Sequence, residues 1–151
     1  MRKFAIAALV CGVALAGLRM SDARAEVLIT ADEARLPASA NTSPLKRGIT
    51  RGPGIDQELP AADRSVQSPL PFRVKFETRN GVPIDVSSVK LTYLKATPVD
   101  LTARVKKYIT PSGIEIGQAI APAGIHFVQV DLKDMQGRAG SAIVKITVAN
   151  R

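Results

Sequence analysis

Two runs of alternating apolar and polar residues, joined by a turn, dominate the chain between residues 123 and 148. The apolar positions are Val128, Val130 and Leu132 in the first run and Ala142, Val144, Ile146 and Val148 in the second. A period of two is typical of a strand with one buried face. Residues 134–138 have the composition of a hairpin loop, in which Gly137 can take the left-handed position. The pattern predicts a β-hairpin, which needs further strands because a two-stranded ribbon is only marginally stable alone.

Four more strands are predicted upstream of this hairpin. The clearest covers residues 70–78, where Phe72, Val74 and Phe76 alternate with polar residues before an Asn80-Gly81 turn. Ile55, Leu59 and Pro60 predict a first irregular edge strand, since prolines are tolerated at sheet edges. The other two strands are residues 88–95, with Val89, Leu91 and Tyr93 alternating with other residues, and residues 114–121, with the apolar positions Ile114, Ile116 and Ile120. Pro83 and Asp85 favour a loop before residue 88.

Residues 98–109 depart from the period of two. Their apolar positions, spaced at i, i+4, i+7 and i+8, are Leu101, Val105, Tyr108 and Ile109. This spacing places them on one face of a helix, for which Asp100 or Thr102 is a candidate N-cap. We therefore expect one short amphipathic helix or helical turn.

The first 25 residues have the parts of a secretory signal peptide. A basic start, Met1-Arg2-Lys3, is followed by an apolar run to Leu18 and by an Ala23-Arg24-Ala25 cleavage pattern. The apolar run is shorter than the roughly 20 residues that span a bilayer. We expect cleavage near Ala25 and a periplasmic or secreted protein. Lipidation at Cys11 is the disfavoured alternative, because no small residue directly precedes this cysteine and the apolar run continues past it.

Cleavage changes the charge and the cysteine content. The net charge falls from +8 to about +5, a modest excess that specifies no partner. The only cysteine, Cys11, leaves with the signal peptide, which excludes disulfides and thiolate metal sites from the remaining chain. The length that remains suits one domain.

Residues 26–52 are rich in Ala, Ser, Thr, Pro and Gly and show no sustained period. They predict a flexible leader, in which Pro37 limits a helical turn that could begin at Asp32. A tether is favoured over a docking peptide that orders on a partner. Trimming this leader to a core near Gly52 is expected to leave the thermal transition unchanged.

The closing pattern P-A-G-I-H-x-x-x-V-x-L-x-D-x-x-G-R-x-G, at residues 122–140, resembles the last two strands of bacterial immunoglobulin-like and fibronectin-like domains. The chain as a whole is similar to small secreted proteins of Gram-negative bacteria that carry one such domain. The resemblance implies an all-β fold, an antiparallel immunoglobulin-like β-sandwich of six or seven strands over residues 53–151. It concerns the architecture only, because the chain has no tryptophan and no cysteine pair.

His126 is the only histidine. In the resembling domains a tyrosine or histidine at this corner often bonds back to loop backbone, which implies a structural role, with Gly124 and Gly137 at the turns beside it. Asp131 and Asp134 lack the spacing of a calcium loop and are interpreted as solvated strand and turn positions. We expect no metal site and no cofactor.

No nucleophile has a recognisable flanking motif. Ser87-Ser88 falls in a predicted turn between strands, and only a lysine-assisted serine stays open as a formal alternative. The chain is therefore expected not to be an enzyme, and an unrecognised hydrolase ranks third among the functions considered.

One basic run stands out. This run covers residues 104–108 and is preceded by two more lysines. The candidate binding surface consists of Lys90, Lys95, Arg104, Lys106, Lys107 and Tyr108. Such a surface could contact lipid phosphates, anionic glycans or an acidic protein, but a solvated helix face is favoured. Nucleic acid is disfavoured by an aromatic content of 4% and the lack of a stacking motif. Reversing the charges of Arg104, Lys106 and Lys107 is expected to leave the fold intact.

The leading hypothesis is a non-catalytic periplasmic or secreted module that acts through protein–protein contacts with an envelope or secreted protein. The alternative is an anionic-ligand or polysaccharide-binding domain, or one that meets a membrane surface, using the basic helix.

Overall fold

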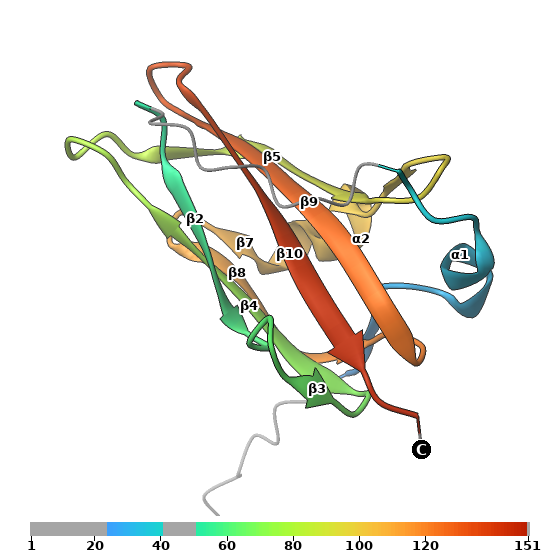
Figure 1. The fold of residues 1–151 in the computed structure, drawn as a ribbon. Coiled ribbons are helices and arrows are strands. Elements are labelled where there is room, and N and C mark those ends of the chain that lie inside the picture. The colour runs from blue at the N-terminus through green and yellow to red at the C-terminus, as the bar shows by residue number, and fades with distance from the viewer. Residues whose placement is uncertain (1–23, 41–50, 151) are drawn as a thin grey trace, which may run out of the picture.

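The computed structural model of the protein describes residues 24–40 and 51–150, which form two β-sheets over one shared core (Figure 1). The first sheet has the order β1-β8-β4-β2, with β7 paired to β8, and the second has the order β3-β10-β9-β5-β6. The strands of the first sheet are β1 (Glu26–Val27), β2 (Gly54–Leu59), β4 (Leu70–Glu77), β7 (Ile109–Thr110) and β8 (Gly113–Ile120). Those of the second are β3 (Ser65–Val66), β5 (Ile84–Tyr93), β6 (Val99–Asp100), β9 (Gly124–Asp134) and β10 (Ala139–Val148). The prediction of an all-β protein is confirmed.

The terminal hairpin has the predicted form. β9 and β10 pair antiparallel from Gly124 opposite Val148 to Lys133 opposite Ala139. Of the predicted inward positions, all are buried except Ala142, which is half-buried. Gly137 has a φ of 79°, the left-handed conformation that the loop was expected to require.

The strand predicted at residues 70–78 is β4, in which buried and exposed residues alternate throughout. Phe72, Val74 and Phe76 face the core. The turn that follows has positive φ at both Asn80 and Gly81, as the sequence indicated. β2 lies at the edge of its sheet, which also agrees with the prediction.

Two strand predictions are wrong in detail because bulges change the pairing. β5 begins at Ile84, and a register shift between Asp85 and Lys90 places Ser87-Ser88 inside the strand and not in a turn. In β8 the register shifts between Ile116 and Ala119 relative to β4. Ala119 is therefore fully buried and Ile120 is only half-buried, the reverse of the predicted alternation.

The predicted helix is two short helical turns, α2 (Thr102–Val105) and η1 (Lys106–Tyr108). Leu101 and Val105 are 0% exposed, while Tyr108 and Ile109 pack against the core from its margin. The prediction of Asp100 or Thr102 as the N-cap is wrong, because Leu101 takes that position and α2 begins at Thr102. Asp100, one residue before the cap, accepts a hydrogen bond from the Thr102 N–H at 2.8 Å.

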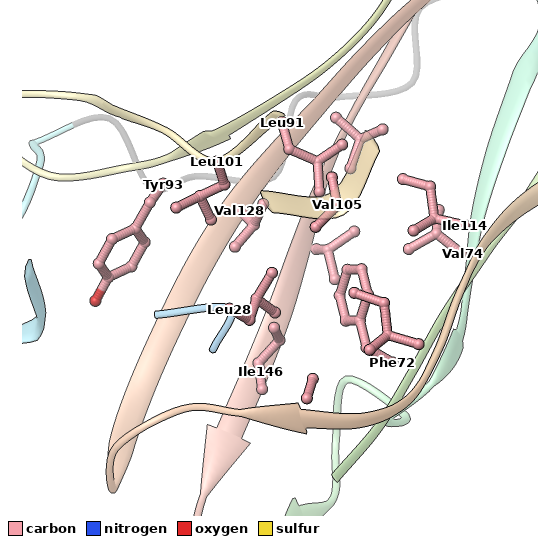
Figure 2. Packing of buried hydrophobic residues seen from close by; sticks show 14 of the residues in the cluster. Leu28, Phe72, Val74, Leu91, Tyr93, Leu101, Val105, Ile114, Val128 and Ile146 are labelled. Atoms are coloured by element: carbon pink, nitrogen blue, oxygen red, sulfur yellow. The ribbon is translucent and has the colours of Figure 1, made fainter. Parts of the chain in front are cut away.

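The prediction of a structureless leader is wrong for residues 26–37, which we call the N-terminal segment. Its strand β1 pairs in parallel with the edge of β8, Glu26 opposite Ala119 and Val27 opposite Ile120. Leu28 and Ile29 are 0% and 1% exposed, and Figure 2 shows Leu28 among buried side chains of both sheets. A helical turn, α1 (Ala31–Arg35), follows. The sequence showed no face for this segment to bury, because the sheet edge and the core that receive it are formed by residues far along the chain.

Residues 1–23 of the predicted signal peptide and residues 41–50 of the predicted leader lie outside the described residues. Within the described ranges, no helix is long and apolar enough to cross a membrane.

Candidate functional site

Four of the six predicted surface residues contact the N-terminal segment. We call the surface that receives this segment the acceptor site, made by Lys95, Arg104, Lys107, Tyr108 and the β8 edge at Ala119–Ile120. Lys95 lies over the Tyr93 ring, 5.1 Å from its centroid, and donates hydrogen bonds to the Ala34 and Leu36 carbonyls at 2.8 and 3.0 Å. This lysine therefore holds the backbone at the end of α1.

Arg104 makes the most extensive of these contacts. Its Nη1 and Nη2 donate to the two carboxylate oxygens of Glu33 at 2.8 and 2.6 Å, and Nη1 also donates to the Leu28 carbonyl at 3.1 Å. A bidentate arginine–carboxylate pair is among the stronger polar contacts in proteins. The hydrogen bonds from Arg104 are the main reason that the pKa of Glu33 falls from 4.5 to about 2.

Glu33 also caps the helical turn on which it lies. Its carboxylate accepts the Thr30 N–H at 2.9 Å, while the Thr30 hydroxyl oxygen accepts the Glu33 N–H at 3.2 Å. This reciprocal pair is a capping box, whose T-x-x-E spacing was present in the sequence as a signal for an ordered turn. One carboxylate thus fixes α1 and joins it to the acceptor site.

A second acidic contact anchors β1. Lys107 Nζ lies 2.6 Å from Glu26 Oε2, and the Tyr108 hydroxyl donates to the same oxygen at 3.1 Å. The hydrogen bond from Lys107 is the largest cause of the lowered pKa of Glu26, and in return it raises the pKa of Lys107. Lys90 and Lys106 are exposed and form no ion pair with a described residue. The six predicted residues therefore do not form one free basic surface. Four of them contact the N-terminal segment, and the two exposed lysines, Lys90 and Lys106, do not.

We expect the stability of the protein to fall in acid partly through Glu33. Because the folded-state pKa is lowered from 4.5 to about 2, this carboxylate stabilises the fold fully above pH 4.5, and its contribution is lost as the pH falls toward 2. Urea denaturation between pH 6 and pH 2.5 should show a smaller loss for Glu33→Gln than for the unmodified protein. Equal slopes for the two proteins would contradict this assignment.

His126 is 2% exposed and both of its ring nitrogens are hydrogen-bonded. Nε2 lies 2.8 Å from the Pro122 carbonyl, which can only accept, so Nε2 carries the proton. Nδ1 must then accept from the Tyr93 hydroxyl, also at 2.8 Å. Burial lowers the pKa of His126, and burial also raises that of Tyr93 to about 12. The bond to loop backbone is the one that the sequence resemblance implied, with Gly124 at the corner in a positive φ of 132°.

His126→Ala should lower the free energy of unfolding by ~1 kcal/mol or more, since a buried hydrogen-bonded side chain is lost. The measurement is the urea midpoint, with Zn²⁺ titrated in parallel into both proteins. A stoichiometric Zn²⁺ complex that the substitution abolishes would show a ligand role in place of a structural one.

The predicted solvation of the two turn aspartates is wrong for Asp134, whose residue is 2% exposed. Its carboxylate accepts the backbone N–H groups of Gln136 and Arg138 and the Arg138 Nε, at 2.9, 3.0 and 2.6 Å. Burial alone would raise the pKa of Asp134, but these hydrogen bonds outweigh it and the pKa is lowered. Asp131 instead accepts bonds from the Gln129 and Ser141 side chains. Both carboxylates are engaged by neighbouring side chains and backbone, and the described residues contain no group of three or more possible metal ligands.

A shallow groove of about 550 Å³ lies over β4 and the β7–β8 turn. An ion pair between Arg73 and Glu115 lies along this groove. The hydroxyl groups that line the groove belong to Thr78, Thr110 and Ser112, and its lining residues include no histidine and no cysteine. Nothing in this groove forms a nucleophile with an adjacent base. The acceptor site differs from this groove in that its side chains make several direct hydrogen bonds and ion pairs to a bound segment.

Comparison with protein-family models, with curated proteins and with solved structures finds no match. The function must therefore be argued from the geometry of the chain itself.

The acceptor site combines three kinds of contact with the N-terminal segment. It offers a strand edge for backbone pairing, a buried region that takes two adjacent apolar side chains, and cations that pair with flanking carboxylates. Addition of a strand to an exposed sheet edge is a recurring way in which domains bind extended peptides. In this structure the peptide is a part of the same chain.

Proposed function

We propose that the protein is a non-catalytic periplasmic or secreted module with an immunoglobulin-like fold that acts through protein–protein contacts. The strand order supports the fold. β2, β4 and β8 correspond to strands A, B and E of an immunoglobulin-like sandwich, and β5, β9 and β10 to strands C, F and G of its opposite sheet. His126 occupies the corner where such domains carry a tyrosine that bonds upstream backbone.

The position of β1 links this fold to the proposed activity. In the immunoglobulin constant-type arrangement, strand D pairs with the outer edge of strand E. Here β7, from the interval between β5 and β8, covers the outer edge of β8 only at Gly113 and Ile114, and β1 pairs in parallel farther along the same edge, at Ala119 and Ile120. The edge of β8 is therefore a place where a separate stretch of polypeptide adds to the sheet.

The observation that carries the proposal is the occupancy of this edge by a segment held through both apolar and ionic contacts. Leu28 and Ile29 are buried, and Glu26 and Glu33 pair with Lys107 and Arg104. We infer that the module captures extended acidic peptide segments of partner proteins at the same site. Binding of an anionic glycan or lipid through the basic residues is less well supported, because it would require Arg104 and Lys107 to leave their carboxylate partners.

A labelled peptide with the sequence of residues 26–37 tests this proposal in the full chain. Glu33→Arg places a cation against Arg104 and should loosen the chain's own segment, so this variant should bind the added peptide more tightly than the unmodified protein does. Asp32→Arg is the matched control, because the Asp32 side chain is 92% exposed and its ion pair within residues 24–40 and 51–150 is with the exposed Arg35. Fluorescence anisotropy measures the affinity.

Adding Arg104→Glu to the Glu33→Arg variant should weaken peptide binding, because the added peptide would then meet a carboxylate. Equal affinity of the Glu33→Arg and Asp32→Arg variants for the peptide would contradict peptide capture at this site.

A further inference from the structure

The N-terminal segment is attached to the rest of the domain in an unusual way. Its strand pairing with β8 extends over only two residues, and α1 contributes no buried residue. Its remaining anchors are Leu28 and Ile29 in the core, Ala34 packed at the margin of the core, and the polar contacts made by Lys95, Arg104, Lys107 and Tyr108. Backbone hydrogen bonds add the Leu28 and Ile29 N–H groups to the Ile120 carbonyl and the Ala96 N–H to the Pro37 carbonyl. Short elements with few buried residues are those that open locally before the whole domain unfolds.

Opening leaves an acceptor site that is unfavourable when empty. The positions of two fully buried apolar side chains become exposed, and Arg104, whose side chain is 32% exposed in the closed form, loses its partner. A segment of the same chemistry would restore all of these contacts. The only sequence shown by the structure to fit the site is that of residues 26–37.

We propose that the acceptor site takes the N-terminal segment of a second copy of this chain, so that copies exchange this segment and associate. This inference rests on the proposed capture of peptides at the β8 edge and names the partner. In the exchanged form, residues 26–37 come from the second copy and the acceptor site from the first. The hydrogen bonds to the Ile120 carbonyl, the burial of Leu28 and Ile29, and both ion pairs are then the same as in the single chain.

The connection between segment and domain allows the exchange. Ten residues, 41–50, join the described segment to the described sheets, and an extended chain of that length reaches at most roughly 33–36 Å. The segment can therefore reach the acceptor site of a second copy when that site lies within this distance. Reciprocal exchange closes a dimer, whereas exchange in one direction produces head-to-tail chains.

A zero-length carbodiimide cross-link tests the proposal on the unmodified protein. The reagent joins a lysine to a carboxylate in direct contact, and Lys107 and Glu26 are 2.6 Å apart. Equal amounts of ¹⁴N- and ¹⁵N-labelled protein are mixed, incubated, cross-linked and digested for mass spectrometry. We expect Lys107–Glu26 peptides that carry one label on each side, in a fraction that grows with protein concentration.

The exposed residues Lys75 and Lys133 serve as the internal control, since random collisions would join them to carboxylates as readily. Only same-label Lys107–Glu26 peptides at all concentrations, or mixed labels equally frequent at Lys75 and Lys133, would overturn the exchange. If the added peptide binds the Glu33→Arg variant but no mixed label forms, peptide capture stands and exchange between copies is wrong. If both experiments fail, the proposed function is wrong as well.

Discussion

Leu28→Ala should lower the free energy of unfolding by about 2–5 kcal/mol, the range for a leucine truncated in a packed core. Leu28 is 0% exposed and belongs to the same hydrophobic cluster as the buried residues of both sheets. For a residue that the sequence placed in a dispensable leader, an effect of this size would be a direct sign that the segment is part of the fold. Urea denaturation followed by circular dichroism gives the value.

The neighbouring residue provides the control for this experiment. Val27 lies in the same two-residue strand but is 43% exposed, so Val27→Ala should change the stability by less than about 0.5 kcal/mol. Equal and small effects of the two substitutions would mean that the segment does not occupy the core in solution. Removal of residues 26–37 should likewise destabilise the domain, contrary to the sequence-based expectation of an unchanged transition.

Arg104→Glu should destabilise the protein by about 2 kcal/mol, between the values for exposed and for buried ion pairs, because the contact is half-buried. The substitution removes three hydrogen bonds, two to Glu33 and one to the Leu28 carbonyl, and places two carboxylates together. It also reverses an expectation from the sequence, which treated this arginine as an exposed charge of no importance for folding.

A double-mutant cycle identifies the partner of Arg104. Glu33→Arg alone should also destabilise, and the two substitutions together should recover a part of the loss, because the opposite charges face each other again. Lys106→Glu is the matched control on the same helical stretch, and its exposed side chain predicts a change within about 0.5 kcal/mol. Additive losses in the double variant would show that the two residues do not interact.

The sequence predicted most accurately those elements whose signal is local. The alternation of Phe72, Val74 and Phe76 and the terminal hairpin were recognisable because each strand carries its own period of two. The burial of Ile120 was predicted wrongly, because the register shift in β8 arises from its pairing with β4 and leaves no mark on the local pattern.

The N-terminal segment was missed for a related reason. Two adjacent buried residues, Leu28 and Ile29, produce no period, and the core cluster that they join is formed by residues far along the chain. The Thr30–Glu33 capping box was the one local signal of order in this stretch. The basic residues of the candidate site were found from composition, but their carboxylate partners were not, because charge density alone does not show which anion a cation contacts.

The central claim is that the N-terminal segment is a peptide held at the edge of β8 that opens on its own. Amide hydrogen exchange at Leu28 and Ile29 tests it most directly, because both N–H groups donate to the Ile120 carbonyl, at 3.0 and 3.2 Å. These amides should exchange much more slowly than in the free peptide of residues 26–37, yet faster than core amides such as those of Val128 and Val144. Exchange at the rate of the free peptide would contradict the account, because the segment would then not be bound to the sheet.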